Sequence, residues 1–303
     1  MVLQHMKILK TSCLTAEQLN DINKLEALCR EKDCLCGSLF LTPELNDNPE
    51  IPCFFLMYDN SDGTLAAFLS LFIPSAAAAE VSACTHPAKR RQGCFNALLK
   101  SARNVLLQYG ISRFCFVTEP SSVTAAAVLA RLSAAYAYSE YFMIYSNASA
   151  SVRRASTDSA GNAASAPYRL IPAGRAALNR HISIHSAAFN NTVPESRAFI
   201  TEIFSEAAYK KFSFCDSLGR ILGCCYADVS GSKAVVFGVC ISPEAQGQRL
   251  GQLMVAMLIK DYLLPCGKPV ILEVSSQNAK AVHIYKKLGF TAASQFDYWF
   301  TTE

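Results

Sequence analysis

The residues best placed for chemistry in this sequence lie in a short loop between an apolar segment and a predicted helix. The apolar segment covers residues 235–241, the loop covers 246–251, and the helix is predicted over about 250–264. The first amide N–H groups of a helix have no intrahelical partner, and the helix dipole is positive there. Gly247 and Gly251 let the backbone approach an anion closely. This order predicts a phosphate-binding site.

A second set of candidate residues lies on a predicted helix over 278–288. Asn278 and Tyr285 are seven residues apart, which is nearly two helical turns, so both side chains leave the helix on one face. Gly289 is typical of the left-handed residue that ends a helix. A phenol with a pKa of about 10 is protonated at neutral pH and can donate a proton.

Together the two segments resemble the acetyl-CoA-binding core of the GCN5-related N-acetyltransferase (GNAT) family. The family pattern Gln/Arg-x-x-Gly-x-Gly/Ala is matched from Gln246 to Gly251, except that Arg249 replaces the first glycine. The pattern Asn-x(6)-Tyr-x-x-Leu-Gly-Phe is matched without departure from Asn278 to Phe290. The departure requires Arg249 to adopt the backbone angles of a glycine with a side chain attached.

The resemblance implies an N-acetyltransferase that moves an acetyl group from acetyl-CoA to a primary amine by direct attack on the thioester. It implies that Tyr285 is the general acid facing the sulfur and that Asn278 bonds the pantetheine. Strands over 235–241 and 270–274 are implied to part and to bind the pantetheine through exposed backbone. The implied cofactor-binding residues are Val239, Cys240, Ile241, Gln246, Gly247, Gln248, Arg249, Leu250, Gly251, Gln252 and Asn278.

The general base and the acceptor stay open at this point. Segment 235–241 has no carboxylate, and the candidate bases are Glu80, His86, Asp228, Glu244, Glu273 and a water chain. A small amine, an amino acid, an aminoglycoside-like compound and a peptide N-terminus all fit as acceptor. The alternatives are a coenzyme A-binding sensor or pseudoenzyme without acetyl transfer, and an interaction scaffold that binds no cofactor. Asn278 and Tyr285 weigh against both.

The chain also contains two copies of one α/β unit. The segment Cys240-Ile-Ser-Pro243 aligns with Cys84-Thr-His-Pro87, and the loop 246–251 aligns with 90–95. A two-residue difference in the next connection then aligns Asn278 with Thr124 and Tyr285 with Arg131. The first copy therefore lacks both side chains, and the second copy is the predicted catalytic one.

The predicted fold class is α/β, with tandem GNAT (acyl-CoA N-acyltransferase) folds whose mixed, mostly antiparallel sheets are flanked by helices. We predict a degenerate N-terminal domain over residues 1–146 and a catalytic C-terminal domain over 167–303. Residues 147–166 are rich in Ser, Ala, Gly and Asn, which is typical of a linker.

Composition and charge exclude several other classes of protein. A length of 303 residues with 51% hydrophobic and 17% charged residues is typical of a folded chain with two cores. The net charge of +4 is too small to indicate a nucleic-acid partner. The longest apolar run, 65–79, is interrupted and shorter than the roughly 18 residues of a membrane span, so no membrane partner is expected. The oligomeric state is open.

The thirteen cysteines form no disulfide framework in their spacing. The first residues show no secretory signal, so we expect reduced thiols and a cytoplasmic protein. Cys29, Cys34 and Cys36 lack a second pair at zinc spacing, and no metal site is predicted.

Overall fold

The computed structural model describes residues 5–146 and 167–301. The predicted linker, 147–166, lies outside the described residues. The described residues fall into two compact units: unit 1 draws on Met1–Ser139 and Ser294–Glu303, and unit 2 draws on Glu140–Ala293. The predicted division at residues 146 and 167 stays a prediction, and these units differ from it because the end of the chain groups with unit 1.

Unit 1 is built on a mixed sheet. Its first strands, in spatial order, are β1 (Met6–Thr11), β2 (Phe54–Asp59), β3 (Leu65–Ser75), β4 (Ala78–Thr85) and β5 (Phe114–Thr118). Neighbours from β1 to β4 are antiparallel, whereas β4 and β5 are parallel. The hairpin that joins β2 to β3 turns at Asp62-Gly63, with Gly63 in the left-handed region at φ +72°.

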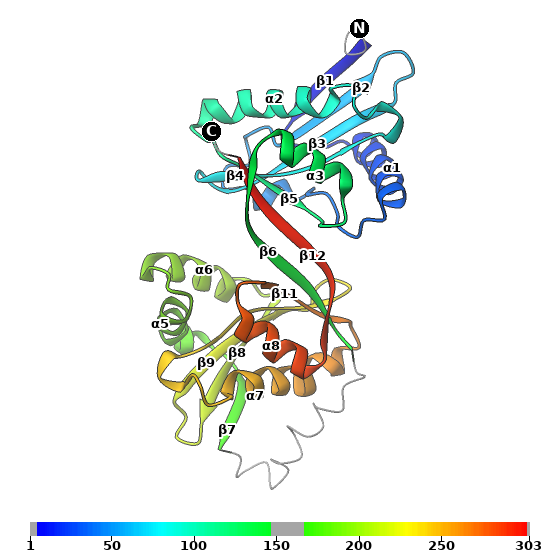
Figure 1. Cartoon of the computed structure of the whole chain (residues 1–303). Coiled ribbons are helices and arrows are strands. Elements are labelled where there is room, and N and C mark those ends of the chain that lie inside the picture. The colour runs from blue at the N-terminus through cyan, green and yellow to red at the C-terminus, as the bar shows by residue number, and fades with distance from the viewer. Residues whose placement is uncertain (1–4, 147–166, 302–303) are drawn as a thin grey trace. The chain divides into compact units, whose positions relative to one another are not determined.

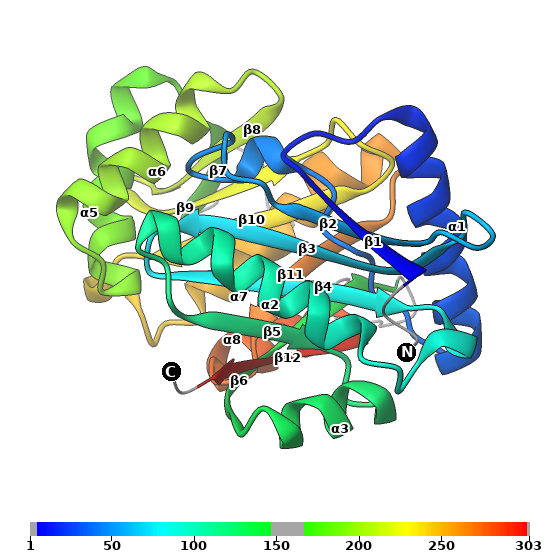
Figure 2. The same cartoon turned by 90° about the horizontal axis from the view of Figure 1, so that it is seen from above.

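The helices of unit 1 are α1 (Ala16–Asp33), α2 (Cys94–Leu106) and α3 (Val123–Arg131). Helix α1 begins at a capping box, in which Thr15 and Gln18 each accept a backbone N–H of the other. Helix α2 packs on β2, β3 and β4 (Figure 2), and its buried residues complete an apolar cluster with those strands.

Unit 2 repeats this arrangement (Figure 1). Its strands are β7 (Tyr168–Pro172), β8 (Tyr209–Asp216), β9 (Ile221–Asp228), β10 (Ala234–Ile241) and β11 (Val270–Ser275). Its helices are α5 (Leu178–Phe189), α6 (Val193–Ser205), α7 (Leu250–Met257) and α8 (Ala279–Leu288). Neighbouring strands are antiparallel except β10 and β11, which are parallel.

The two faces of the sheet in unit 2 carry different helices. Helices α7 and α8 bury Leu250, Met254 and Tyr285 against one face, in a cluster that includes Ile241 of β10. Helices α5 and α6 pack on the other face, where Cys240 of β10 is buried. Side chains that alternate along β10 therefore reach different surroundings.

Two long strands pass from one unit to the other. Strand β6 (Ala134–Tyr145) begins in unit 1, and its last residues pair with β11 in unit 2. Strand β12 (Phe290–Thr301) begins in unit 2, and its last residues pair with β5 in unit 1. Each sheet is thus completed by a strand that the other repeat begins. The prediction of an α/β fold with mixed, mostly antiparallel sheets flanked by helices is confirmed.

Candidate functional site

The candidate site of unit 2 is organised around a gap between β10 and β11. The two strands pair only from Ala234↔Val270 to Val236↔Leu272. Beyond Val236, the edge of β10 that faces away from β9 has no strand partner among the residues that the structure describes. Backbone groups on such an edge can bind an extended ligand in the manner of an added strand.

A β-bulge lies in β10 at the start of this gap. Gly238 and Val239 together oppose the single residue Cys225 of β9, because the register shifts between Phe237 and Cys240. Gly238 has φ +57°, and a Cβ at this position would lie 2.5 Å from Cδ2 of Tyr226. Both the angle and the contact require glycine here. A bulge redirects the side chains that follow it, so it sets the direction of Val239, Cys240 and Ile241.

A buried polar network holds Tyr226 against the bulge. The Tyr226 hydroxyl lies 2.9 Å from Nδ1 of His181, and Nε2 of His181 lies 2.8 Å from Oγ of Ser213. Tyr226 and His181 are both 0% exposed, so each polar atom needs such a partner. Burial lowers the pKa of His181 to about 4, which keeps its ring neutral at pH 7. Sequence reasoning missed this network because its members share no motif.

The loop after β10 has the conformation of an anion site. Gln246 reaches back and donates from Nε2 to the carbonyl oxygen of Ile241 at 3.0 Å. Gly247 and Arg249 are both left-handed, with φ +78° and +60°. Arg249 thus adopts the backbone angles that its place in the motif requires. Within the described chain, no acceptor is found for the amide N–H groups of residues 247–252.

Helix α8 begins at Asn278 and ends at Gly289, which has φ +100°. The Oδ1 atom of Asn278 accepts the backbone N–H of Ala281 at 3.1 Å, and the side chain is exposed. One polar atom of Asn278 therefore caps the helix, whereas its amide N–H groups remain available to a ligand.

Tyr285 is buried on the α8 side of the sheet, in the apolar cluster that also contains Ile241 and Val274. It is 8% exposed, and its ring meets Phe290 edge to face with centroids 5.7 Å apart. Burial, and after it the thiols of Cys225 and Cys240, raise the pKa of Tyr285 to about 12. The hydroxyl is therefore protonated at neutral pH and can act as a proton donor.

The structure brings most of the predicted site residues to this gap and divides them between its two faces. Ile241, Leu250 and Tyr285 share one apolar cluster, against which Val239 packs, whereas Cys240 belongs to the cluster under α5 and α6. Gln246, Gly247, Gln248 and Arg249 are exposed on the loop, and Gly251 and Gln252 lie half-buried in the first turn of α7.

The three candidate bases of unit 2 differ in their surroundings. Hydrogen bonds from Ser230 lower the pKa of Asp228. The pKa of Glu244 is lowered by its own backbone N–H and then by Arg180, with which it forms an ion pair at 2.8 Å. Both groups therefore bind a proton weakly.

Glu273 has the opposite electrostatic setting. It lies between Leu272 and Val274, whose side chains belong to the cluster that contains Tyr285. By the alternation of a strand, Glu273 points to the other face. Part of its side chain is exposed to solvent, but partial burial of the carboxyl group, followed by the charge of the Glu140 carboxylate, raises the pKa of Glu273. A carboxylate with a raised pKa is the better proton acceptor near neutral pH.

The first repeat differs from the predicted alignment. Ser122 caps α3 as Asn278 caps α8, and Ser133 has φ +52° where Gly289 ends the second helix. Leu129, 5% exposed, therefore occupies the place of Tyr285. The sequence alignment with Thr124 and Arg131 was wrong by two residues, because the connection has the same length in both repeats, from Cys84 to Ser122 and from Cys240 to Asn278. The one extra residue of the second repeat lies upstream, in the β10 bulge.

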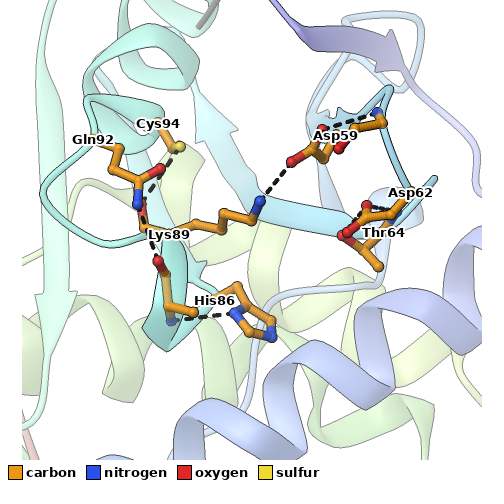
Figure 3. A network of polar contacts seen from close by, with 9 residues as sticks. Asp59, Asp62, Thr64, His86, Lys89, Gln92 and Cys94 are labelled. Carbon is orange, nitrogen blue, oxygen red and sulfur yellow. Dashed lines mark hydrogen bonds and ion pairs between the residues drawn. The ribbon is translucent and has the colours of Figure 1, made fainter. Parts of the chain in front are cut away.

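The matching strand and loop of unit 1 are also altered. The register of β3 with β4 is unbroken from Ala67↔Thr85 to Phe72↔Glu80, so β4 has no bulge along this stretch. The side chains of the loop that follows bond to backbone carbonyls of the same loop and to Asp59 of β2 (Figure 3). Lys89 pairs with Asp59 at 2.5 Å, and Gln92 donates to the carbonyl oxygen of Ala88 at 3.0 Å. The candidate bases Glu80 and His86 belong to this unit, and Nδ1 of His86 accepts the backbone N–H of Ala88.

Over residues 5–146 and 167–301, no three His, Cys, Asp or Glu side chains lie close enough together to hold a metal ion. No helix within the same ranges has the length and apolar content needed to cross a membrane. All thirteen cysteines are free thiols.

Comparisons with known proteins agree with this geometry. Residues 179–290 match the model of the acetyltransferase (GNAT) family. A mycothiol acetyltransferase of Arthrobacter sp. (strain FB24) is 40% identical over 83 residues, which span 25% of this chain and 25% of that protein. The chain therefore matches only about a quarter of the curated relative.

Two solved structures show the same fold over almost the whole chain. A GCN5-related N-acetyltransferase from Sphaerobacter thermophilus has a TM-score of 0.78 at 13% identity, covering 99% of this chain and 96% of that one. A tandem GNAT protein from the clavulanic acid biosynthesis pathway has a TM-score of 0.69 at 16% identity, covering 97% and 98%. At these identities the likeness concerns the fold alone.

Proposed function

Residues 179–290 belong to the acetyltransferase (GNAT) family, and from this premise we propose that the second repeat moves an acetyl group from acetyl-CoA to an amine. The observation that carries the proposal is that β10 and β11 stop pairing after Val236, and that Tyr285 shares one apolar cluster with Ile241 and Val274, which lie beyond that point on the two strands. An extended thioester and a protonated phenol can meet there.

The residues of unit 2 fit acetyl-CoA as the donor substrate. The free amide N–H groups of 247–252 and the positive end of the α7 dipole suit a pyrophosphate. The unpaired edge of β10 at Val239, Cys240 and Ile241 suits the amides of the pantetheine arm. The amide of Asn278 lies exposed at the start of α8, where it can bond the same arm.

The chemistry needs one proton acceptor and one proton donor. The amine nitrogen forms a bond to the thioester carbonyl carbon, and the carbon–sulfur bond breaks. Glu273, on the α5 and α6 face, takes the proton that the amine loses. Tyr285, on the α7 and α8 face, gives its proton to the departing sulfur and regains one from solvent. The acid and the base thus act from opposite sides of the gap.

The test is the variant Tyr285→Phe, which keeps the ring packing against Phe290. We expect kcat to fall by roughly 10²-fold, because the departing thiolate then lacks its proton donor. The dissociation constant for acetyl-CoA, measured by calorimetry, should stay the same. Tyr262→Phe is the matched control, since the Tyr262 hydroxyl donates to the carbonyl oxygen of Leu170. Turnover of Tyr285→Phe at the rate of the parent would remove Tyr285 as the acid.

A further inference from the structure

A cavity of about 290 Å³ lies on the α5 and α6 face of unit 2, outside the donor site proposed above. Aromatic, aliphatic and acidic side chains from α6 and from β8, β9 and β10 line it: Phe199, Glu202, Ile203, Tyr209, Asp228, Val235 and Phe237. Tyr209 and Phe237 meet edge to face with ring centroids 5.2 Å apart. Aromatic rings beside carboxylates form a favourable site for an organic cation.

The two carboxylates of this cavity are not equivalent. Asp228 accepts the backbone N–H and the hydroxyl of Ser230, and it lies in the field of Lys268. The carboxylate of Glu202 has no hydrogen bond or ion pair with any residue in the described part of the chain, and only its backbone carbonyl accepts hydrogen bonds. Burial, with the charges of Asp228, Glu202 and Glu206 adding to it, raises the pKa of Tyr209. Both carboxylates therefore act on the same space, and the charge of Glu202 is the less compensated.

The cavity is connected to the gap by β10. Phe237, one of its walls, is the first residue after the last β10–β11 pair. From Phe237 to Cys240 there are three strand residues, which span about 10 Å or less. Glu273 and the cavity are on the same face of the sheet. A ligand held in the cavity can thus extend to the proposed base.

The amine that attacks a thioester has to be uncharged, so the carboxylates of this cavity suit a different group of the acceptor. We infer that the cavity selects acceptors that carry a second cationic group within about 10 Å of the reacting amine, such as a diamine or a polyamine. The inference rests on the proposed function and adds the substrate class. A monoamine of the same length would leave Glu202 without a partner.

The experiment compares acetyl transfer from acetyl-CoA to 1,6-diaminohexane and to n-hexylamine. We expect kcat/KM to be roughly tenfold or more higher for the diamine, as for a cation bound by a desolvated aromatic and acidic site. Glu202→Gln should remove most of this preference by raising KM for the diamine, and it should leave n-hexylamine unaffected. Glu206→Gln is the control, because Glu206 follows α6 and its charge also acts on Tyr209, but it does not line the cavity. It therefore separates direct contact with the ligand from the general effect of a negative charge.

Calorimetric titration with 1,6-diaminohexane separates the inference from the function on which it rests. In one outcome the diamine binds, Glu202→Gln weakens this binding and Glu206→Gln does not, but neither amine is acetylated. This outcome would keep the cavity as a cation site and overturn the acetyltransferase proposal. If both amines are acetylated at similar kcat/KM and Glu202→Gln changes neither value, the inference that the cavity binds a cation is overturned and the acetyltransferase proposal is kept. The inference would also be overturned if the diamine does not bind and the enzyme does not prefer the diamine to the monoamine.

Discussion

Acidification should destabilise unit 2, because it protonates a histidine that supports the site. His181 is 0% exposed, and both ring nitrogens hydrogen bond with the hydroxyls of Tyr226 and Ser213. Burial lowers its pKa from 6.5 to about 4. The folded pKa is below the unfolded value, so the unfolded chain binds the proton more tightly. Stability is therefore complete above about pH 6.5 and is lost as the pH falls towards 4.

The size of the effect follows from the two pKa values. A drop from 6.5 to about 4 corresponds to about 3 kcal/mol of unfolding free energy once the pH is below 4. At pH 5 the same linkage amounts to about 2 kcal/mol. His185, whose pKa is also lowered by burial, adds to the loss. Carboxylates with lowered pKa, such as Asp216, act mainly below this range, because their unfolded pKa is near 4.

Urea unfolding at pH 7.5 and pH 5.0, combined with native-state hydrogen exchange of β8 and β9, measures the loss in unit 2. Trp299 is the only tryptophan and lies in unit 1, so its fluorescence follows that unit separately. In His181→Gln the difference between the two pH values should shrink by about 2 kcal/mol. His283→Gln, which changes an exposed histidine of α8, is the control. An equal loss of stability in the parent and in His181→Gln would refute this account of the network.

Three further substitutions test the donor site. Gly238→Ala should lower stability by about 1–3 kcal/mol and reduce acetyl transfer, since its Cβ would lie 2.5 Å from the ring of Tyr226 at a left-handed φ; an unchanged melting temperature would contradict the tight bulge. Arg249→Gly should change stability by less than about 1 kcal/mol, because glycine removes the strain of the left-handed angle but also raises the conformational entropy of the unfolded chain. Calorimetry should find a similar affinity for acetyl-CoA, and a loss of affinity above roughly tenfold would show that the guanidinium is a ligand. Asn278→Ala should lower the free energy of unfolding by about 1 kcal/mol, because helix α8 loses its N-cap. Asn278→Ser should restore stability, since serine can also cap the helix, but it should not restore the affinity for acetyl-CoA. Full affinity in both variants would exclude the Asn278 amide as a ligand.

The sequence predicted those features that a few neighbouring residues decide. The left-handed Gly289 ends its helix as the pattern indicated. The helix predicted from about residue 250 begins at Leu250. Each of these features depends only on interactions between neighbouring residues. The same holds for the order of the elements, which the hydrophobic periods predict within each repeat.

Features that depend on pairing between distant segments could not be predicted in this way. The edge strands β1 and β7 were missed, and the end of β12 pairs with β5, which is far away in sequence. The bulge at Gly238 depends on the register of β10 with β9, and a glycine in an apolar run only hints at it. The face to which Glu273 points, on which the proposed base depends, is defined only once that sheet is formed.

The misaligned repeat shows what separates the two copies physically. From Cys84 to Ser122 and from Cys240 to Asn278 the spacing is the same (122 − 84 = 278 − 240 = 38), so the loops and helices are preserved as a unit.

The difference lies upstream, in the strand. The register of β3 places Ser70 where the second repeat has Tyr226, and the Ser70 hydroxyl has no partner within the described residues. Without that supported ring and the glycine above it, β4 runs straight. A tyrosine hydroxyl in place of Leu129 would then meet no bulge that directs β4 towards a donor. The bulge and the hydroxyl are therefore useful only together, and both are absent from the first repeat.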